Sequence, residues 1–260
     1  MAKDLRGLLQ SVFKARGLTV MRRDLARKLL GGKDPEQTLD LLAALPTDAI
    51  DAILPLLPRS RAQLSQDLFV LAQTGFRRNG FFVEFGATNG LDLSNTHLLE
   101  KDFGWSGILA EPARRWHADL RRNRDCHIET DCVWRATGET ILFREAEAGE
   151  LSTIASFSDG DRHEAGRRSA TDYAVETISL ADLLEKYEAP ADIDFLSIDT
   201  EGSEFDILAA FPFDRHRFRV IACEHNFTPA RRKIHALLEA NGYRRVMERA
   251  SRFDDWYVSD

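Results

Sequence analysis

The stretch FFVEFGATNG, residues 81–90, constrains the fold of this chain more than any other. Three apolar residues lead into Glu84 and then into a turn punctuated by Gly86 and Gly90. This pattern predicts a buried strand that breaks into a tight turn. Glycines permit left-handed backbone angles and a close approach to a ligand, as the first strand-to-helix turn of a doubly wound sheet requires. Because an ordinary strand-turn-helix connection has the same pattern, the rest of the chain must decide between the two.

The remainder of the chain divides into two parts. Residues 1–78 carry leucines at helical spacing, interrupted by Gly31-Gly32 and by prolines, and predict helices of which the last begins at Arg61. We interpret this part as a cap. Three roles stay open for it: a surface for oligomerisation, a lid over the substrate, and a docking module for another enzyme. Residues 79–260 alternate strand and helix patterns. The sequence therefore predicts an α/β fold, with a doubly wound, Rossmann-like sheet and an N-terminal all-helical cap.

Composition narrows the class of protein. Acidic residues number 42 against 35 Lys plus Arg, so the formal charge of −7 gives no general attraction to nucleic acid. No run of eighteen apolar residues occurs, and we expect no transmembrane segment and no signal peptide. The three cysteines contain no CxxC pair, which favours a reducing compartment. We expect a cytoplasmic protein.

Acidic residues follow several of the predicted strands. Glu84 lies near the end of the first strand, Glu111 ends the second, Asp199 ends the strand DFLSI, and Glu224 ends the next one. The carboxyl ends of parallel strands meet along one edge of a sheet, where ligands bind. A carboxylate at such a place is costly unless it is paired, so this row predicts a ligand with hydroxyl groups and positive charge.

Glu111 has a more specific interpretation. An acid that ends the second strand, about twenty residues after a glycine turn, is where nucleotide-binding folds bind the ribose hydroxyls. The alternative is that Glu111 only caps the helix that starts at Pro112. We favour the ribose, because strand, glycine turn and acid occur in the required order.

Five segments together resemble the FkbM family of S-adenosylmethionine-dependent methyltransferases. They are VEFGATNGLDLSNTHLLEKDFGWSGILAEP, NR, DCVW, DFLSIDTEGSEFDIL and ACEHN, and the resemblance covers roughly residues 80–260. It implies a class I methyltransferase sheet, with the glycine turn at the amino acid end of the cofactor, the second acid on the ribose and DC near the adenine. The residues implied to bind the cofactor are Glu84, Gly86, Ala87, Thr88, Asn89, Gly90, Ser94, Asn95, Thr96, Glu111, Pro112, Asp131, Cys132 and Asp199.

The chemistry of the turn agrees with this resemblance. GATNG departs from the GxGxxG spacing of a pyrophosphate site, which argues against an NAD-type dehydrogenase. S-adenosylmethionine carries a sulfonium and an ammonium group, and acidic and carbonyl groups suit it better than a phosphate cradle.

Methyl transfer to a hydroxyl group requires alignment and removal of a proton. Our candidates for that chemistry are Asp199, Glu201, Glu204 and His225. His225 titrates near neutrality and is a candidate general base, and a loop histidine bonded to backbone is the alternative. Oxygen-rich sets also suit magnesium or manganese. A divalent metal held by Asp199, Glu224, His225 or Asn226 therefore stays open, although the sequence contains no compact metal motif.

The chemical class of the methyl acceptor is implied only by the resemblance to the FkbM family. The family implies O-methylation of a sugar hydroxyl in a polysaccharide, glycolipid or natural product. Two alternatives stay open: methylation of nitrogen or of a small non-sugar metabolite, and a non-catalytic module that binds a partner through its helical cap. The polar segment 158–171 is either a loop that closes over an anionic or sugar substrate or a solvated insertion. A homo-oligomer formed through the N-terminal helices is a further expectation.

Overall fold

The computed structural model describes residues 22–157 and 170–260. The first 21 residues of the predicted helical part and most of the loop predicted at 158–171 lie outside the described residues. The helices are α2 (Arg23–Leu29), α3 (Pro35–Ala43), α4 (Thr47–Ile53), α5 (Gln66–Gln73), α6 (His97–Phe103), α7 (His117–Asn123), α8 (Leu180–Lys186), α9 (Glu204–Ala209), α10 (Ala230–Ala240) and α11 (Glu248–Ser251). The strands are β1 (Phe81–Phe85), β2 (Ser106–Ala110), β3 (His127–Glu129), β4 (Cys132–Trp134), β5 (Thr140–Ala146), β6 (Thr153–Ile154), β7 (Ala170–Ser179), β8 (Asp192–Ile198), β9 (Arg217–Glu224), β10 (Tyr243–Val246) and β11 (Asp254–Ser259).

Within the described residues, seven strands form the main sheet in the order β10-β11-β9-β8-β1-β2-β3. Strand β1 lies inside the sheet, next to the central strand β8, and pairs in parallel with β2 and β8. Strand β11 runs antiparallel to both of its neighbours, β9 and β10. The chain order reverses beside β1, since β2 and β3 lie on one side and β8 and β9 on the other. Ligands bind at the carboxyl ends of the strands next to such a reversal.

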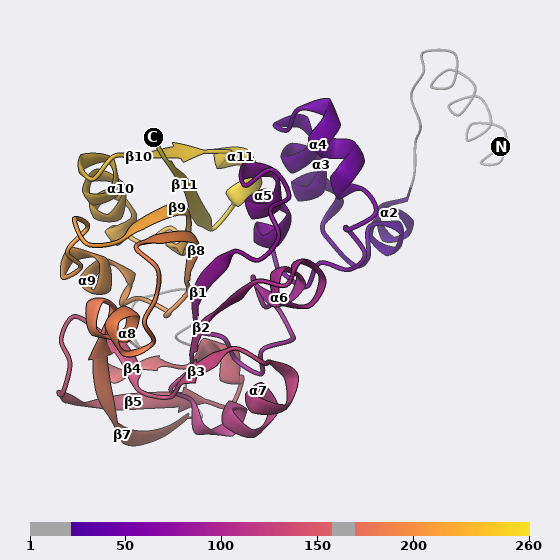
Figure 1. Cartoon of the computed structure of the whole chain (residues 1–260). Helices are drawn as coiled ribbons and strands as arrows, with labels where there is room; N and C mark the ends of the chain where they lie inside the picture. The colour runs from indigo at the N-terminus through magenta and orange to yellow at the C-terminus, as the bar shows by residue number, and fades with distance from the viewer. Residues whose placement is uncertain (1–21, 158–169) are drawn as a thin grey trace, which may run out of the picture.

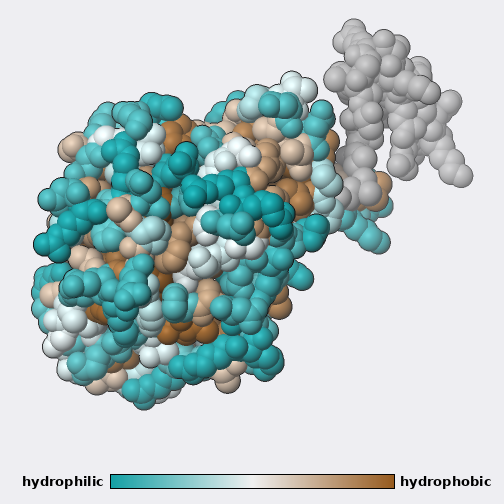
Figure 2. Space-filling view, in the orientation of Figure 1, coloured by the Kyte–Doolittle hydropathy of each residue, from teal (hydrophilic) through white to brown (hydrophobic). Residues whose placement is uncertain are grey.

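Helices cover both faces of the main sheet, as the apolar runs in its strands require (Figure 1). Successive residues of β1 face opposite cores. Phe82 packs with residues of α5 and α6, and Val83 packs with residues of α8 and α10. Hydrophilic residues cover most of the face of the molecule shown in Figure 2. In the part of the chain that the structure describes, no helix is both long and apolar enough to span a bilayer.

A second sheet, which the sequence did not predict, has the strand order β4-β7-β5-β6. The alternating strand and helix patterns of residues 79–260 give no sign that these strands leave the main series. Their apolar side chains form a small core of their own that includes Trp134 and Phe143. This sheet lies next to the carboxyl edge of the main sheet and closes one side of the cavity described below.

The helical region, α2 to α5, packs on the main sheet. Leu41, Ile53 and Leu68 belong to the same buried cluster as Phe82 and Trp256. The last helix begins at Gln66, five residues later than predicted, because Ser65 adopts a left-handed φ of 63°. Residues 61–65 instead form a loop against the main sheet. An oligomer formed through these helices stays a prediction.

Candidate active site

A cavity opens at the carboxyl ends of β1, β2 and β8, beside the point where the strand order reverses. It encloses about 1020 Å³ of space, part of which is open to solvent. Among the residues that the structure describes, its lining contains six acids and no Lys, Arg or His. The acids are Glu84, Asp92, Glu111, Asp199, Glu201 and Asp254. These carboxyl groups can accept hydrogen bonds from the hydroxyl groups of a ligand or interact with a positive charge on it.

At the glycine turn the cavity is lined by main-chain atoms, because Gly86 has no side chain. Gly86 has a φ of +73°, and a Cβ atom there would lie 2.1 Å from the carbonyl oxygen of Asp199. Its N–H donates to the carbonyl oxygen of Ala110 at 3.1 Å. Only glycine fits between β1 and β8 at this point. Ala87 and Thr88 line the cavity beyond it, whereas Gly90 packs against Arg124 outside the lining.

Glu84 is buried and is compensated by groups of the protein itself. Its carboxylate accepts hydrogen bonds from the Asn95 N–H at 2.7 Å, from the Ser94 hydroxyl at 3.1 Å and from the Thr96 hydroxyl. Ser94 and Asn95 line the cavity, and Thr96 does not. Glu84 therefore orders the loop that precedes α6, in addition to facing the cavity.

Arg124 supplies the positive charge behind that loop. Its side chain is fully buried, and its Nε donates to Glu100 at 2.6 Å. Its guanidinium also donates to the hydroxyls of Ser94 at 3.0 Å and Thr96 at 2.8 Å, and lies 3.8 Å from Glu84. We did not predict this role, although Arg124 stands in the NR segment of the family resemblance.

Glu111 faces the cavity from the end of β2. One carboxylate oxygen accepts the N–H of Thr88 at 2.7 Å, and the other accepts the N–H of Ala113 at 2.8 Å. The contact with Ala113 is the helix-cap interaction weighed above, and the contact with Thr88 fixes the glycine turn. Burial raises the pKa of Glu111 to about 7, against the effect of these two amides. Each oxygen keeps a second lone pair, so the carboxylate can still accept a ligand hydroxyl.

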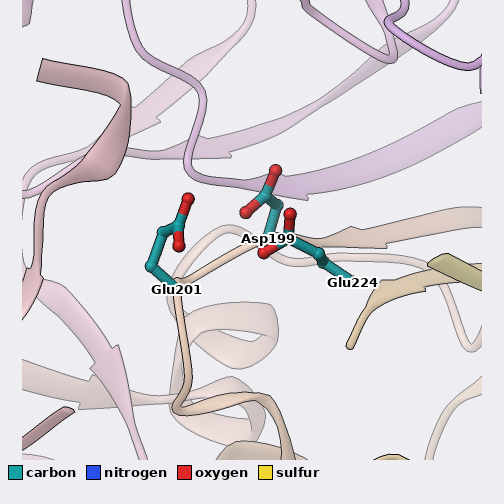
Figure 3. Close-up of side chains that lie close together, drawn as sticks. All are labelled: Asp199, Glu201 and Glu224. Carbon is teal, nitrogen blue, oxygen red and sulfur yellow. The ribbon is translucent and has the colours of Figure 1, made fainter. Parts of the chain in front are cut away.

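Three carboxyl groups face one another where β8 and β9 end (Figure 3). Asp199, Glu201 and Glu224 each offer an oxygen within 4.8 Å of the others. Burial, and then the charge of Asp199, raises the pKa of Glu224 far above its ordinary value. Such a group is compensated by a proton, a cationic ligand or a metal ion. Asp199 and Glu201 line the cavity, and Glu224 stands behind them.

His225 lies outside this arrangement. Its Nδ1 accepts the N–H of Phe227 at 2.9 Å, and its Nε2 lies 3.7 Å from Asp255. Residues paired directly across β9 and β11 point to the same face of the sheet. Asp255, the neighbour of His225, pairs with Cys223 on one face, whereas Glu224 pairs with Asp254 on the other. The described contacts of His225 are those of a backbone-bonded loop histidine, and it does not meet Asp199 in the described cavity lining.

Other predicted site residues support the cavity from outside its described lining. Glu204 accepts the N–H groups of Thr200 and Gly202 at 3.0 Å and thereby holds the loop after β8. Asn89 bonds to Asp92 within the glycine turn. Three further predicted residues lie outside the lining: Glu224, Asn226 and Asp131. Pro112 and Cys132, in contrast, do line the cavity.

Several lining residues were not predicted from the sequence, and four of them come from two distant segments. Gln63 and Gln66 belong to the helical region, Phe253 directly precedes β11, and Asp254 begins it. No spacing rule connects these two segments, since almost 190 residues separate Gln66 from Asp254. Only the three-dimensional packing brings them together.

Comparison with known proteins identifies the central part of the chain. The FkbM methyltransferase domain matches residues 84–245, more than half of the chain. No curated protein matches it. One similar solved structure is precorrin-6Y C5,15-methyltransferase from Geobacter metallireducens, at 12% identity and a TM-score of 0.38 over 69% of this chain and 71% of that chain. Another is an uncharacterised protein from Burkholderia thailandensis, at 11% identity and a TM-score of 0.28 over 99% and 72%. Neither likeness is strong enough to inform the site. The domain match shows that this chain belongs to the FkbM methyltransferase family.

Proposed function

We propose that the chain is an S-adenosylmethionine-dependent O-methyltransferase whose acceptor is a sugar hydroxyl of a polysaccharide, glycolipid or natural product. The observation that carries the proposal is the described cavity lining, with its six carboxyl groups. This lining complements a ligand that carries a sulfonium and an ammonium group. The strand order, with β11 as the antiparallel member, supports a doubly wound class I methyltransferase sheet under a helical cap.

The residues present fit such a cofactor. The backbone of Gly86, Ala87 and Thr88, together with Ser94 and Asn95, would hold its amino acid end. Asn95 fits this role because its Oδ1 is buried without a hydrogen-bond donor among the described residues.

The nucleoside end of the cofactor fits the part of the cavity around Glu111. Glu111 would accept the ribose hydroxyls, since its two oxygens are fixed by backbone amides but not saturated. Pro112, Cys132 and Val133 would pack on the adenine.

When bound, S-adenosylmethionine supplies a methyl group that its sulfonium has already activated. The chain's own task is then to orient the acceptor oxygen and to take its proton. Asp199 is our candidate for the base, because it directly follows β8 and lines the cavity beside Glu201. In the transfer the C–S bond breaks, a C–O bond forms, and the hydroxyl proton passes to the carboxylate.

Product analysis tests the type of transfer. The full-length protein is incubated with methyl-labelled S-adenosylmethionine and a mixture of hexose, deoxyhexose and aminohexose methyl glycosides, and the products are identified by mass spectrometry. We expect label in a methyl ether. Label on the nitrogen of the aminohexoses would contradict O-methylation and favour the nitrogen acceptor.

A further inference from the structure

Two segments that lie outside the FkbM domain match line the same cavity. Gln63 and Gln66 precede residue 84, and Asp254 follows residue 245. Gln66 and Asp254 are 188 residues apart in the chain and are nevertheless joined by a hydrogen bond. This part of the cavity therefore depends on contacts that hold two distant segments together.

Gln37 of α3 binds the main chain of both segments. Its side-chain Nε2 donates to the carbonyl oxygen of Leu64 at 2.6 Å and to that of Ala250 at 3.1 Å. A glutamine amide has two N–H donors, so one serves each segment. Gln37 is only 2% exposed, and an apolar side chain in its place would take this donor away from two buried carbonyl groups.

The hydrogen bonds continue from Leu64 to Asp254 and close a ring. The N–H of Leu64 donates to Gln66 Oε1 at 2.9 Å, and Gln66 Nε2 donates to Asp254 Oδ2 at 2.8 Å. From Asp254 the main chain leads back to Ala250, four residues earlier, and so to Gln37. A change at Gln37 is therefore transmitted to Gln66 and Asp254 from both sides.

The neighbours of Gln37 reinforce both attachments. Lys33, just before α3, donates from Nζ to the carbonyl oxygen of Ala62 at 2.6 Å. Asp40 lies one turn after Gln37 on the same side of the helix and accepts a hydrogen bond from Arg252 at 2.9 Å. Helix α11 packs on α3 next to this contact. One side of α3 thus holds both segments that line the cavity.

The part of the cavity proposed to hold the cofactor has its own supports. Glu111 accepts the N–H of Thr88, and Glu84 accepts the N–H of Asn95. The hydrogen bonds of the ring involve neither pair. A change at Gln37 should therefore alter the cavity on the side away from the cofactor.

We infer that Gln37 is a positioning residue, which through Leu64 and Ala250 sets the spacing of Gln66 and Asp254 and thereby the fit of the acceptor. The inference rests on the proposed methyltransferase function and adds to it a role for the helical region. In this role α3 is a fixed support of the cavity wall, in contrast to a lid that moves away when ligands exchange.

Hydrogen exchange tests the ring without any substrate. Gln37→Met removes both donors at similar volume, and Leu39→Met, at a position of α3 that is 65% exposed, is the control. Exchange in the full-length proteins is followed by mass spectrometry. In Gln37→Met we expect about tenfold faster exchange in residues 61–66 and 248–254, and less than about a twofold change in residues 81–90 and in the control. Unchanged exchange in the two segments, or an equal rise in residues 81–90, would overturn the inference.

Asp40→Asn is a milder variant that tests the same support if Gln37→Met does not fold. It weakens only the attachment of Arg252. Exchange should rise about threefold in residues 248–254 and stay unchanged in residues 81–90. No change in residues 248–254 would contradict a support by α3.

Steady-state kinetics tests the effect on the acceptor. With the mixture of methyl glycosides named above, Gln37→Met should raise the apparent KM about tenfold, while kcat and the Kd for S-adenosylmethionine stay within about threefold. A general loss of structure would instead lower kcat and weaken cofactor binding together. An unchanged KM, or an equal change in KM and Kd, would overturn the inference. Absence of S-adenosylmethionine binding, or of any transfer, by the unsubstituted protein would contradict the proposed function, whereas the exchange measurement needs neither.

Discussion

The two walls of the cavity differ in how they are built and in where they lie along the chain. The wall around Gly86 and Glu111 lies inside the FkbM domain match and is held by backbone amides and close backbone packing. The wall around Gln66 and Asp254 lies outside the match and is held by side-chain hydrogen bonds. The domain match thus covers the wall proposed to hold the cofactor. The segments before and after the match form the wall on the other side of the cavity.

The largest effect on kcat should come from Asp199, at the boundary between the two walls of the cavity. Asp199→Asn should lower kcat about 100-fold or more, because an amide cannot take the acceptor proton. His225→Ala should change kcat less than threefold, since His225 does not line the described cavity. Single-turnover kinetics with labelled cofactor would measure both. A larger loss for His225→Ala than for Asp199→Asn would reverse the assignment of the base.

The next largest effect should fall on the wall proposed to hold the cofactor. Glu111→Ala should weaken S-adenosylmethionine binding about 30-fold, or ~2 kcal/mol, through loss of the ribose acceptor and of the bond to Thr88. Glu176→Ala removes an equal charge from an exposed position of β7 and serves as the control. Calorimetry on both variants gives the comparison. An unchanged affinity in Glu111→Ala would remove the ribose assignment.

Each wall contains a buried acid whose pKa is raised to about 7, Glu111 on one side and Asp254 on the other. Because these folded-state pKa values exceed the unfolded ones, the folded chain binds more protons, and stability falls as the pH rises toward 8. Asp254→Asn removes this loss. Its Tm relative to the unsubstituted protein should therefore be higher at pH 8 than at pH 6, by the equivalent of about 1 kcal/mol.

Thermal unfolding of the ligand-free protein at the two pH values measures this shift. The comparison with the unsubstituted protein cancels the opposing effect of His97, His117 and His225, whose pKa values are lowered by burial. The same difference in Tm at both pH values would show that Asp254 does not titrate in this range.

The smallest effect should come from Glu224. Burial and the charge of Asp199 raise its pKa and so favour the neutral acid, and Glu224→Gln should therefore keep kcat and cofactor affinity within about threefold. Treatment with EDTA should likewise leave activity unchanged. A loss of more than tenfold in both, restored in the chelated protein by magnesium or manganese, would show instead that Asp199, Glu201 and Glu224 hold a divalent cation.

The wall inside the match could be anticipated from the sequence because its signals are local. The strand FFVEF, the turn glycines and the acid at the end of β2 follow one another in the order that the fold imposes. Asp199 and Glu224, two acids of the predicted row, lie close together because β8 and β9 are neighbours in the sheet.

The opposite wall could not be anticipated, for two physical reasons. Gln66 meets Asp254 only because α5 packs on the core that contains Trp256, and no periodicity in the chain encodes that contact. Burial then decides roles that sequence cannot show. Glu84 seemed to be an unpaired charge, yet Asn95, Ser94 and Arg124 already compensate it.

The central claim is that the acidic cavity binds S-adenosylmethionine, and titration calorimetry tests it most directly. The full-length protein is titrated with S-adenosylmethionine and, in parallel, with S-adenosylhomocysteine, with Glu111→Ala as the matched variant. We predict binding at one site per chain with a Kd in the micromolar range, weakened by the substitution. Absence of binding heat at millimolar concentrations of both ligands would contradict the account.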